Sequence, residues 1–167
     1  MNPLNANFTE LYERHLCRHA QFGINIIHIL AVLGIYVCLY GIGYGIVGVG
    51  WPLFAVAGVH SAILAFNVPL KVLSSTVLFL AAVIALVLSL PLAPIWVYVL
   101  PIYPFYKIQV WSHKVYNVEH DMTEYNKKYK KGFVLFVLLS LYEVPILLNY
   151  LAFDASNWSD GRETQCP

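Results

Sequence analysis

Histidines are the residues of this chain whose chemistry is most informative, and there are six: His15, His19, His28, His60, His113 and His120. His15 and His19 are four residues apart and share one face of a helix, as do His113 and His120, which are seven apart. Imidazole nitrogens bind iron, zinc and copper. Two segments that each contribute a histidine pair predict a metal site, although histidines at a membrane boundary can also simply face water or headgroups.

Further polar residues accompany the histidines. Gln109 and Asn117 lie on the same helical stripe as His113. Glu143 stands inside an apolar segment, where an ionisable residue is rare and often functional. It could pair with a histidine, stay protonated, or orient a metal ligand through a hydrogen bond. His60 is also surrounded by apolar sequence, and we expect it to hydrogen-bond to a neighbouring helix; a proton relay through Glu143 and His60 is the alternative.

The composition predicts the setting of these residues. Hydrophobic residues make up 59% of the 167 residues, charged residues only 11%, and the mean hydropathy is +0.65. A water-soluble domain has roughly a quarter of its residues charged. The chain is therefore expected to be a single all-α integral membrane domain over 1–167. Its net charge of +1 and lack of a basic face exclude a nucleic-acid partner.

The apolar segments predict a polytopic bundle of about five transmembrane helices. An amphipathic helix at the membrane surface is expected first, at about 7–21, with Asn7 and Glu10 as a capping arrangement. Four prolines between 91 and 104 predict a kinked or partly unwound fourth span. The expected spans, followed by a polar tail at 154–167, are about 24–48, 51–67, 72–90, 92–110 and 133–153.

The basic residues predict an orientation. With five spans, nine of the ten Lys and Arg residues fall on one side of the membrane. The positive-inside rule then makes the N-terminus cytoplasmic and places the C-terminal tail on the opposite side. Under this topology every histidine except His60 lies near the cytoplasmic boundary, so the two histidine-bearing segments are expected to meet there.

The chain resembles the Mpo-like family of small endoplasmic-reticulum membrane proteins, typified by a 2-hydroxy fatty acid dioxygenase. The matching features are an H-x8-H pair with an upstream tyrosine and an asparagine between the histidines, a Q-x3-H pair, and a Glu-Val pair in the last span: Tyr12, His19, Asn25, His28, Gln109, His113, Glu143 and Val144. Asn117 stands where the family has glutamate. The resemblance implies an Fe(II)-dependent oxygenase that shortens 2-hydroxy fatty acids by one carbon, with His19, His28 and His113 as ligands.

The leading hypothesis is a histidine-ligated non-haem iron enzyme that acts on a fatty acid or membrane lipid. We expect His15 or His120 to complete the metal shell, and Gln109 and Asn117 to orient ligands or bind the head group of the substrate. Glu143 is the further candidate at the catalytic site. The alternative is an accessory subunit without a metal, packed in a larger membrane protein complex.

Overall fold

The computed structural model describes residues 6–116, 127 and 132–158, and this part of the chain is helical without β-strands. The all-α class is therefore confirmed. Seven segments follow the α-helix α1 at Phe8–His19: the α-helices α2 (Phe22–Val47), α3 (Trp51–Ala65), α4 (Leu70–Ser89), α5 (Ile95–Val115) and α7 (Phe133–Leu148), a π-helix at Asn149–Phe153 and a 3-10 turn at Ala155–Asn157.

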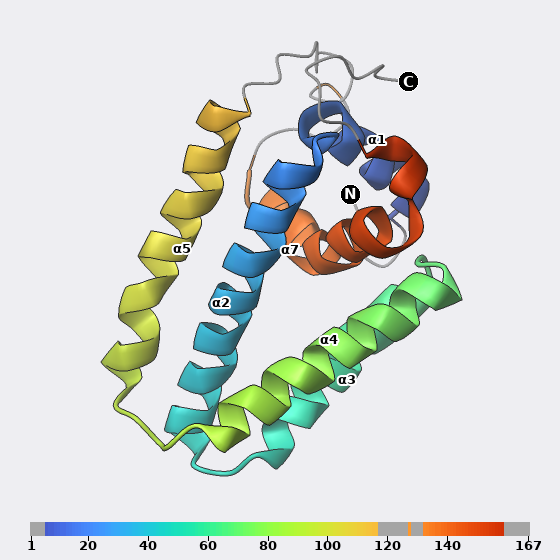
Figure 1. The fold of residues 1–167 in the computed structure, drawn as a ribbon. Helices are drawn as coiled ribbons and strands as arrows, with labels where there is room; N and C mark the ends of the chain where they lie inside the picture. The colour runs from blue at the N-terminus through green and yellow to red at the C-terminus, as the bar shows by residue number, and fades with distance from the viewer. Residues whose placement is uncertain (1–5, 117–126, 128–131, 159–167) are drawn as a thin grey trace.

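The helices form an up-and-down array that is covered at one end. Helices α2 and α5 run side by side in opposite directions, α3 and α4 form a second antiparallel pair that diverges from them, and α1 and α7 lie together near the end where α2 begins (Figure 1). Helix α1 starts as predicted, because the Asn7 side chain accepts a hydrogen bond from the backbone N–H of Glu10 at 3.2 Å. Its apolar face, including Phe8 and Leu11, packs in one core with Leu138 of α7.

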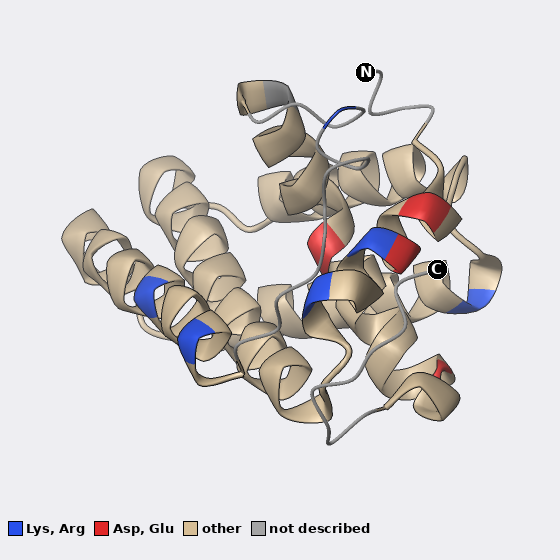
Figure 2. Cartoon of the chain, turned by 90° about the horizontal axis from the view of Figure 1, so that it is seen from above, with Lys and Arg blue, Asp and Glu red and all other residues tan. Residues whose placement is uncertain are grey.

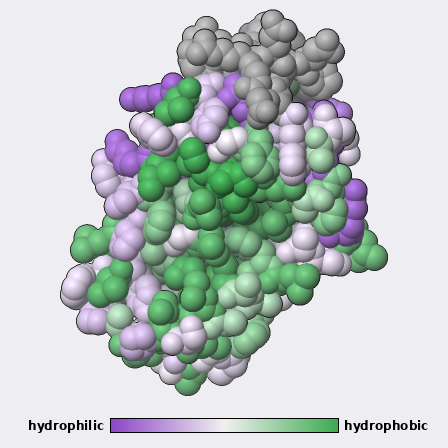
Figure 3. Space-filling view, in the orientation of Figure 1, coloured by the Kyte–Doolittle hydropathy of each residue, from purple (hydrophilic) through white to green (hydrophobic). Residues whose placement is uncertain are grey.

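Within the part of the chain that the structure describes, three helices are long and apolar enough to cross a membrane by length and composition: Phe22–Val47, Leu70–Ser89 and Leu135–Phe153. The apolar helix Trp51–Ala65 is shorter. Charged residues are sparse along the helices (Figure 2), and hydrophobic residues cover much of the face seen in Figure 3. Large apolar side chains are exposed on these helices, as a bilayer requires and water does not tolerate in such numbers.

Residues 90–94, with Pro91 and Pro94, lie outside any helix as the prediction of a partly unwound span expected, but α5 differs from that prediction at the later prolines. It continues through Pro101 and Pro104 as one α-helix from Ile95 to Val115. Each proline removes one backbone donor, but its fixed φ lies in the helical region, so the chain can pass through both positions without ending the helix. The helix that carries His113 therefore extends unbroken from one end of the molecule to the other.

Glycines of α2 set its packing against α5. A Cβ added at Gly23, Gly34 or Gly41 would lie 2.0, 2.4 or 2.3 Å from an aromatic side chain of the facing segment. The partners are Tyr116, Phe105 and Tyr98, so both series step by eleven and seven residues, in opposite chain directions. Steps of seven and eleven return to the same helix face. Each ring thus fills the space above one glycine and fixes the antiparallel register of the two helices.

The segment that follows α7 lies beside α1 and the start of α2. The Tyr12 hydroxyl of α1 donates to Asp154 Oδ2 at 2.5 Å, and Trp158 packs on Phe22 with ring centroids 4.5 Å apart. Tyr150 also donates a hydrogen bond to the backbone oxygen of Ala20. Residues 150–158 therefore lie at the same end of the helix array as α1, whereas the predicted topology places α1 and the polar tail on opposite sides of the membrane. The apolar composition of 133–153 predicted a membrane span. Composition carries no information on orientation, so it could not predict that α7 crosses α2 (Figure 1).

Candidate metal centre

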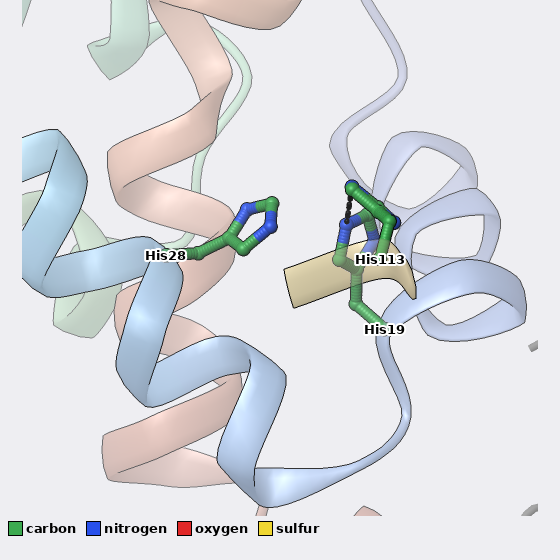
Figure 4. Close-up of side chains that lie close together, drawn as sticks. All are labelled: His19, His28 and His113. Carbon is green, nitrogen blue, oxygen red and sulfur yellow. Dashed lines mark hydrogen bonds between the residues drawn. The ribbon is translucent and has the colours of Figure 1, made fainter. Parts of the chain in front are cut away.

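Three histidines from three helices converge at the covered end of the array. His19 ends α1, His28 lies in the second turn of α2, and His113 lies in the last turn of α5. One side-chain nitrogen of each lies within 4.8 Å of the others, and Figure 4 shows His28 directed at the other two rings. The sequence predicted that these segments meet, and this convergence is confirmed.

The His19 ring is held in an orientation suited to a ligand. Its Nδ1 lies 3.3 Å from the backbone oxygen of His15, which can only accept a hydrogen bond, so Nδ1 carries the proton. Its Nε2 is then unprotonated and lies 3.3 Å from Nε2 of His113. Metal-binding histidines commonly donate their other ring N–H to a backbone carbonyl in this way.

The His28 ring is fixed by α5. Its Nε2 lies 3.1 Å from Ser112 Oγ, and the Ser112 hydroxyl itself donates to the backbone oxygen of Gln109 at 2.7 Å. Ser112 must therefore accept from His28, which leaves Nδ1 of the neutral ring with its lone pair free. That Nδ1 is 3.8 Å from Glu143 Oε1, beyond hydrogen-bond distance, so the carboxylate lies next to the free lone pair without bonding to it.

Glu143 and Gln109, both predicted at the site, are partners of each other. Gln109 Nε2 donates to Glu143 Oε1 at 3.1 Å. This bond holds the carboxylate beside His28, where it can balance the positive charge of a bound cation. The two side chains come from α5 and α7, so the pair also links these helices at the site.

His15 lies beside the three converging histidines and has another partner. Its ring stacks on His19 with centroids 4.3 Å apart, while its Nε2 lies 2.7 Å from Asn25 Oδ1. The Asn25 amide donates to the backbone oxygens of Gln21, at 2.9 Å, and of His19. Asn25 therefore stabilises the turn between α1 and α2, and that turn brings His19 next to His28.

Burial keeps the α1 imidazoles neutral. Loss of solvation lowers the pKa of His15 to about 3 and that of His19 well below its usual value, and neighbouring histidines and arginines lower both further. A neutral imidazole is the form that binds metal. Both rings are thus already in the metal-binding protonation state at neutral pH.

A cavity of about 230 Å³ adjoins the three histidines. Arg14 and Arg18 of α1 line it together with Glu143, and apolar side chains such as Leu139 and Phe136 of α7 form another wall. The cavity therefore offers cationic groups, imidazoles and apolar surface within one small volume.

The other predicted residues have separate fates. Asn117 and His120 lie outside the described residues. His60 Nε2 lies 3.0 Å from the backbone oxygen of Leu141, which confirms the expected hydrogen bond to a neighbouring helix. The sequence analysis assigned no site role to Ser112 or Arg14. Ser112 directly precedes His113 and Arg14 directly precedes His15, and this adjacency was the available signal.

No protein-family model, no curated protein and no solved structure matches this chain. The geometry of the candidate metal centre therefore stands on the chain's own residues. The fold and site together define a membrane-type helical bundle with a histidine cluster at one end.

Proposed function

We propose that this protein is a membrane-embedded enzyme that binds Fe(II) through His19, His28 and His113 and oxidises a lipid. The observation that carries the proposal is the approach of three imidazoles from separate helices to within 4.8 Å. Metal–nitrogen bonds of about 2.1 Å allow ligand nitrogens to be up to roughly 4 Å apart, so only a small movement of one ring is needed.

The donor set fits iron as a resident metal. Three imidazoles leave coordination positions open for oxygen and substrate, and a bound Fe(II) would supply the oxygen activation. Imidazole also suits zinc, so the metal itself is part of the test. The protein orients two of the ligand rings in advance. The His19 ring is fixed through its Nδ1–H, and the His28 ring is fixed through Nε2, which leaves its Nδ1 free for the metal.

The remaining side chains have supporting roles. Glu143, held by Gln109, offsets the charge of a cation at the histidines. Arg14 and Arg18 give the cavity a positive wall that favours an anionic head group. This arrangement supports a fatty acid as substrate, and a 2-hydroxy fatty acid is the substrate that the resemblance to the Mpo-like family suggests.

We further infer that the end of the molecule with the candidate metal centre faces the cytosol. The resemblance to the Mpo-like family suggests that the membrane is that of the endoplasmic reticulum. Arg14, Arg18 and Lys71 belong to this end; the Lys71 Nζ lies 5.1 Å from the ring centroid of Phe153. Positive residues accumulate on the cytoplasmic side of membrane proteins.

Metal analysis of the purified full-length protein tests the proposal. We expect about one iron per chain in the wild type and loss of most of it in His28→Ala and in His113→Ala. His60→Gln is the matched control, because it changes a histidine that lies away from the centre and keeps a donor for Leu141. Absence of bound iron, zinc instead of iron, or undiminished iron in the two alanine variants would overturn it.

A further inference from the structure

A second cavity, of about 360 Å³, lies between α2, α3 and α7. We call it the apolar groove. Its walls include Tyr36 and Gly43 of α2, Leu53 and Val56 of α3, and Phe136 of α7. No residue with a permanent charge lines it, in contrast to the cavity at the histidines.

The polar side-chain atoms of His60 and Tyr36 in the groove are already hydrogen-bonded to the backbone of α7. Pro145 has no N–H, so the oxygen of Leu141, four residues earlier, loses its partner within the helix. His60 Nε2 lies 3.0 Å from that oxygen and supplies the missing donor. The Tyr36 hydroxyl similarly donates to the oxygen of Ser140 at 3.3 Å. The groove therefore presents mainly apolar surface to a ligand.

The apolar groove and the cavity at the histidines share part of their walls. Phe136 and Ser140 of α7 line both of them. The Phe136 side chain is 66% exposed and so is not locked in a core. A molecule with a polar end beside the histidines can therefore extend its other end past Phe136 into the groove.

We propose that the apolar groove binds the acyl chain of the lipid whose polar end is held at the histidines, and that Val56 and Gly43 set the chain length that fits. The proposal rests on the proposed function for the identity of the polar site. From Tyr36 to Gly43 the groove follows two turns of α2, or about 10 Å. A Cβ at Gly43 would be in ordinary contact, 3.5 Å from Leu53 Cδ2, so a larger side chain there can be accommodated only by occupying groove space.

The test uses the full chain in phosphatidylcholine nanodiscs and a palmitic acid probe with a photoactivatable diazirine at its chain end. We expect the probe to label groove residues of α2 and α3, and unlabelled palmitic acid to compete. In Val56→Trp, palmitic acid should compete about tenfold less well, the effect of excluding roughly two methylene groups from an apolar site. Competition by octanoic acid should be unchanged.

Val59→Trp is the matched control, because Val59 and Val56 are on the same helix and are 63% and 59% exposed, but only Val56 lines the groove. Gly43→Phe with Gly58→Phe as control provides a second pair, since a Cβ at Gly58 meets no atom within 4 Å. Equal competition in Val56→Trp, Val59→Trp and wild type, or labelling spread evenly over the lipid-facing helices, would overturn the groove proposal. Iron is measured on the same samples, so loss of the metal hypothesis would be seen separately from loss of the groove.

Discussion

The two sides of α2 are packed in different ways. Towards α5, three glycines each receive an aromatic ring, and the helices approach with no space left for a methyl group. Towards α3 and α7, α2 presents Tyr36 and Tyr40, whose rings line the apolar groove. Close packing thus occurs between the two helices that carry His28 and His113, and open packing occurs at the groove for which we propose a ligand.

The neighbours of α2 are also held by different forces. Helix α5 is positioned by shape, through the glycine–aromatic contacts. Helix α7 packs through apolar side chains such as Leu138. Hydrogen bonds to backbone oxygens add to this packing, from His60 to Leu141 of α7 and from Tyr150, in the π-helix after α7, to Ala20. Because hydrogen bonds are directional, they restrict the orientation of the crossed helix in addition to its apolar packing.

The largest effect should come from disrupting the closely packed interface between α2 and α5. Gly34→Leu would place a side chain where a Cβ already lies 2.4 Å from the Phe105 ring. We expect a loss of about 1–3 kcal/mol in the free energy of unfolding, as for other overpacked interfaces, and reduced metal content because His113 moves with α5. Thermal unfolding in detergent and metal analysis measure both. Adding Phe105→Ala should recover part of the stability, whereas Gly58→Leu should change little; a Gly34→Leu protein as stable as wild type would contradict the glycine–aromatic packing.

The next largest effect concerns the candidate metal centre, which the interface between α2 and α5 positions. Glu143→Gln removes the carboxylate near His28 while keeping a side chain that can bond to Gln109. We expect metal affinity to fall about tenfold, the usual result of losing a group that supports a ligand. Competition with a chelator of known affinity measures it. An unchanged affinity would show that Glu143 does not balance the charge of the metal.

A smaller effect should come from the hydrogen bond between His60 and Leu141 beside the apolar groove. His60→Leu should cost about 1 kcal/mol because Leu141 loses its donor. In a Pro145→Ala background, the restored backbone N–H can bond to Leu141, so the same His60→Leu change should cost almost nothing. Unfolding of the four proteins gives the interaction energy. An equal cost in both backgrounds would argue against the role of His60 as a replacement donor.

The smallest effect should be at the contact between α1 and residue 154. Burial alone would raise the pKa of Asp154, but hydrogen bonds from Tyr12, Asn157 and Ser156 outweigh it and lower the pKa below its ordinary value of 3.8. These bonds therefore stabilise the fold above that value, and their contribution is lost as the pH falls through the lowered pKa.

Tyr12→Phe should cost less than about 1 kcal/mol at neutral pH, because Asp154 is partly exposed to solvent. The difference from wild type should disappear in strong acid. Unfolding measured as a function of pH tests this, with Tyr44→Phe as a control on a tyrosine that does not contact Asp154. A difference that persists unchanged in acid would mean that the contact does not depend on the Asp154 charge.

Much of the fold could be predicted from the sequence because hydropathy and capping are local properties. The Asn7 cap and the bounds of α1 to α4 follow from them within a few residues. The meeting of His19, His28 and His113 also followed from placing each at a helix end on one side. The crossed position of α7 could not be predicted this way, since it depends on partners such as Asn67 for Tyr142 and Ala20 for Tyr150, which are distant in the chain.

The details of the site depend on contacts that spacing does not encode. Gln109 and Glu143 could each be recognised as unusual polar residues, but their bond to each other requires the position of α7. The Ser112 bond to His28 requires the register of α2 against α5. That register was present in the sequence as equal glycine and aromatic steps, and comparing the two series would have been the signal.

The α2–α5 register also limits how the chain can change length. One residue inserted between Phe105 and His113 would turn the histidine by about 100° around the helix axis and shift it by about 1.5 Å. The same insertion between Gly50 and Trp51, in the connection from α2 to α3, would leave every glycine opposite its ring. Natural insertions and deletions in descendants of this sequence should therefore accumulate in the connections and be absent from these seven residues of α5, 106–112.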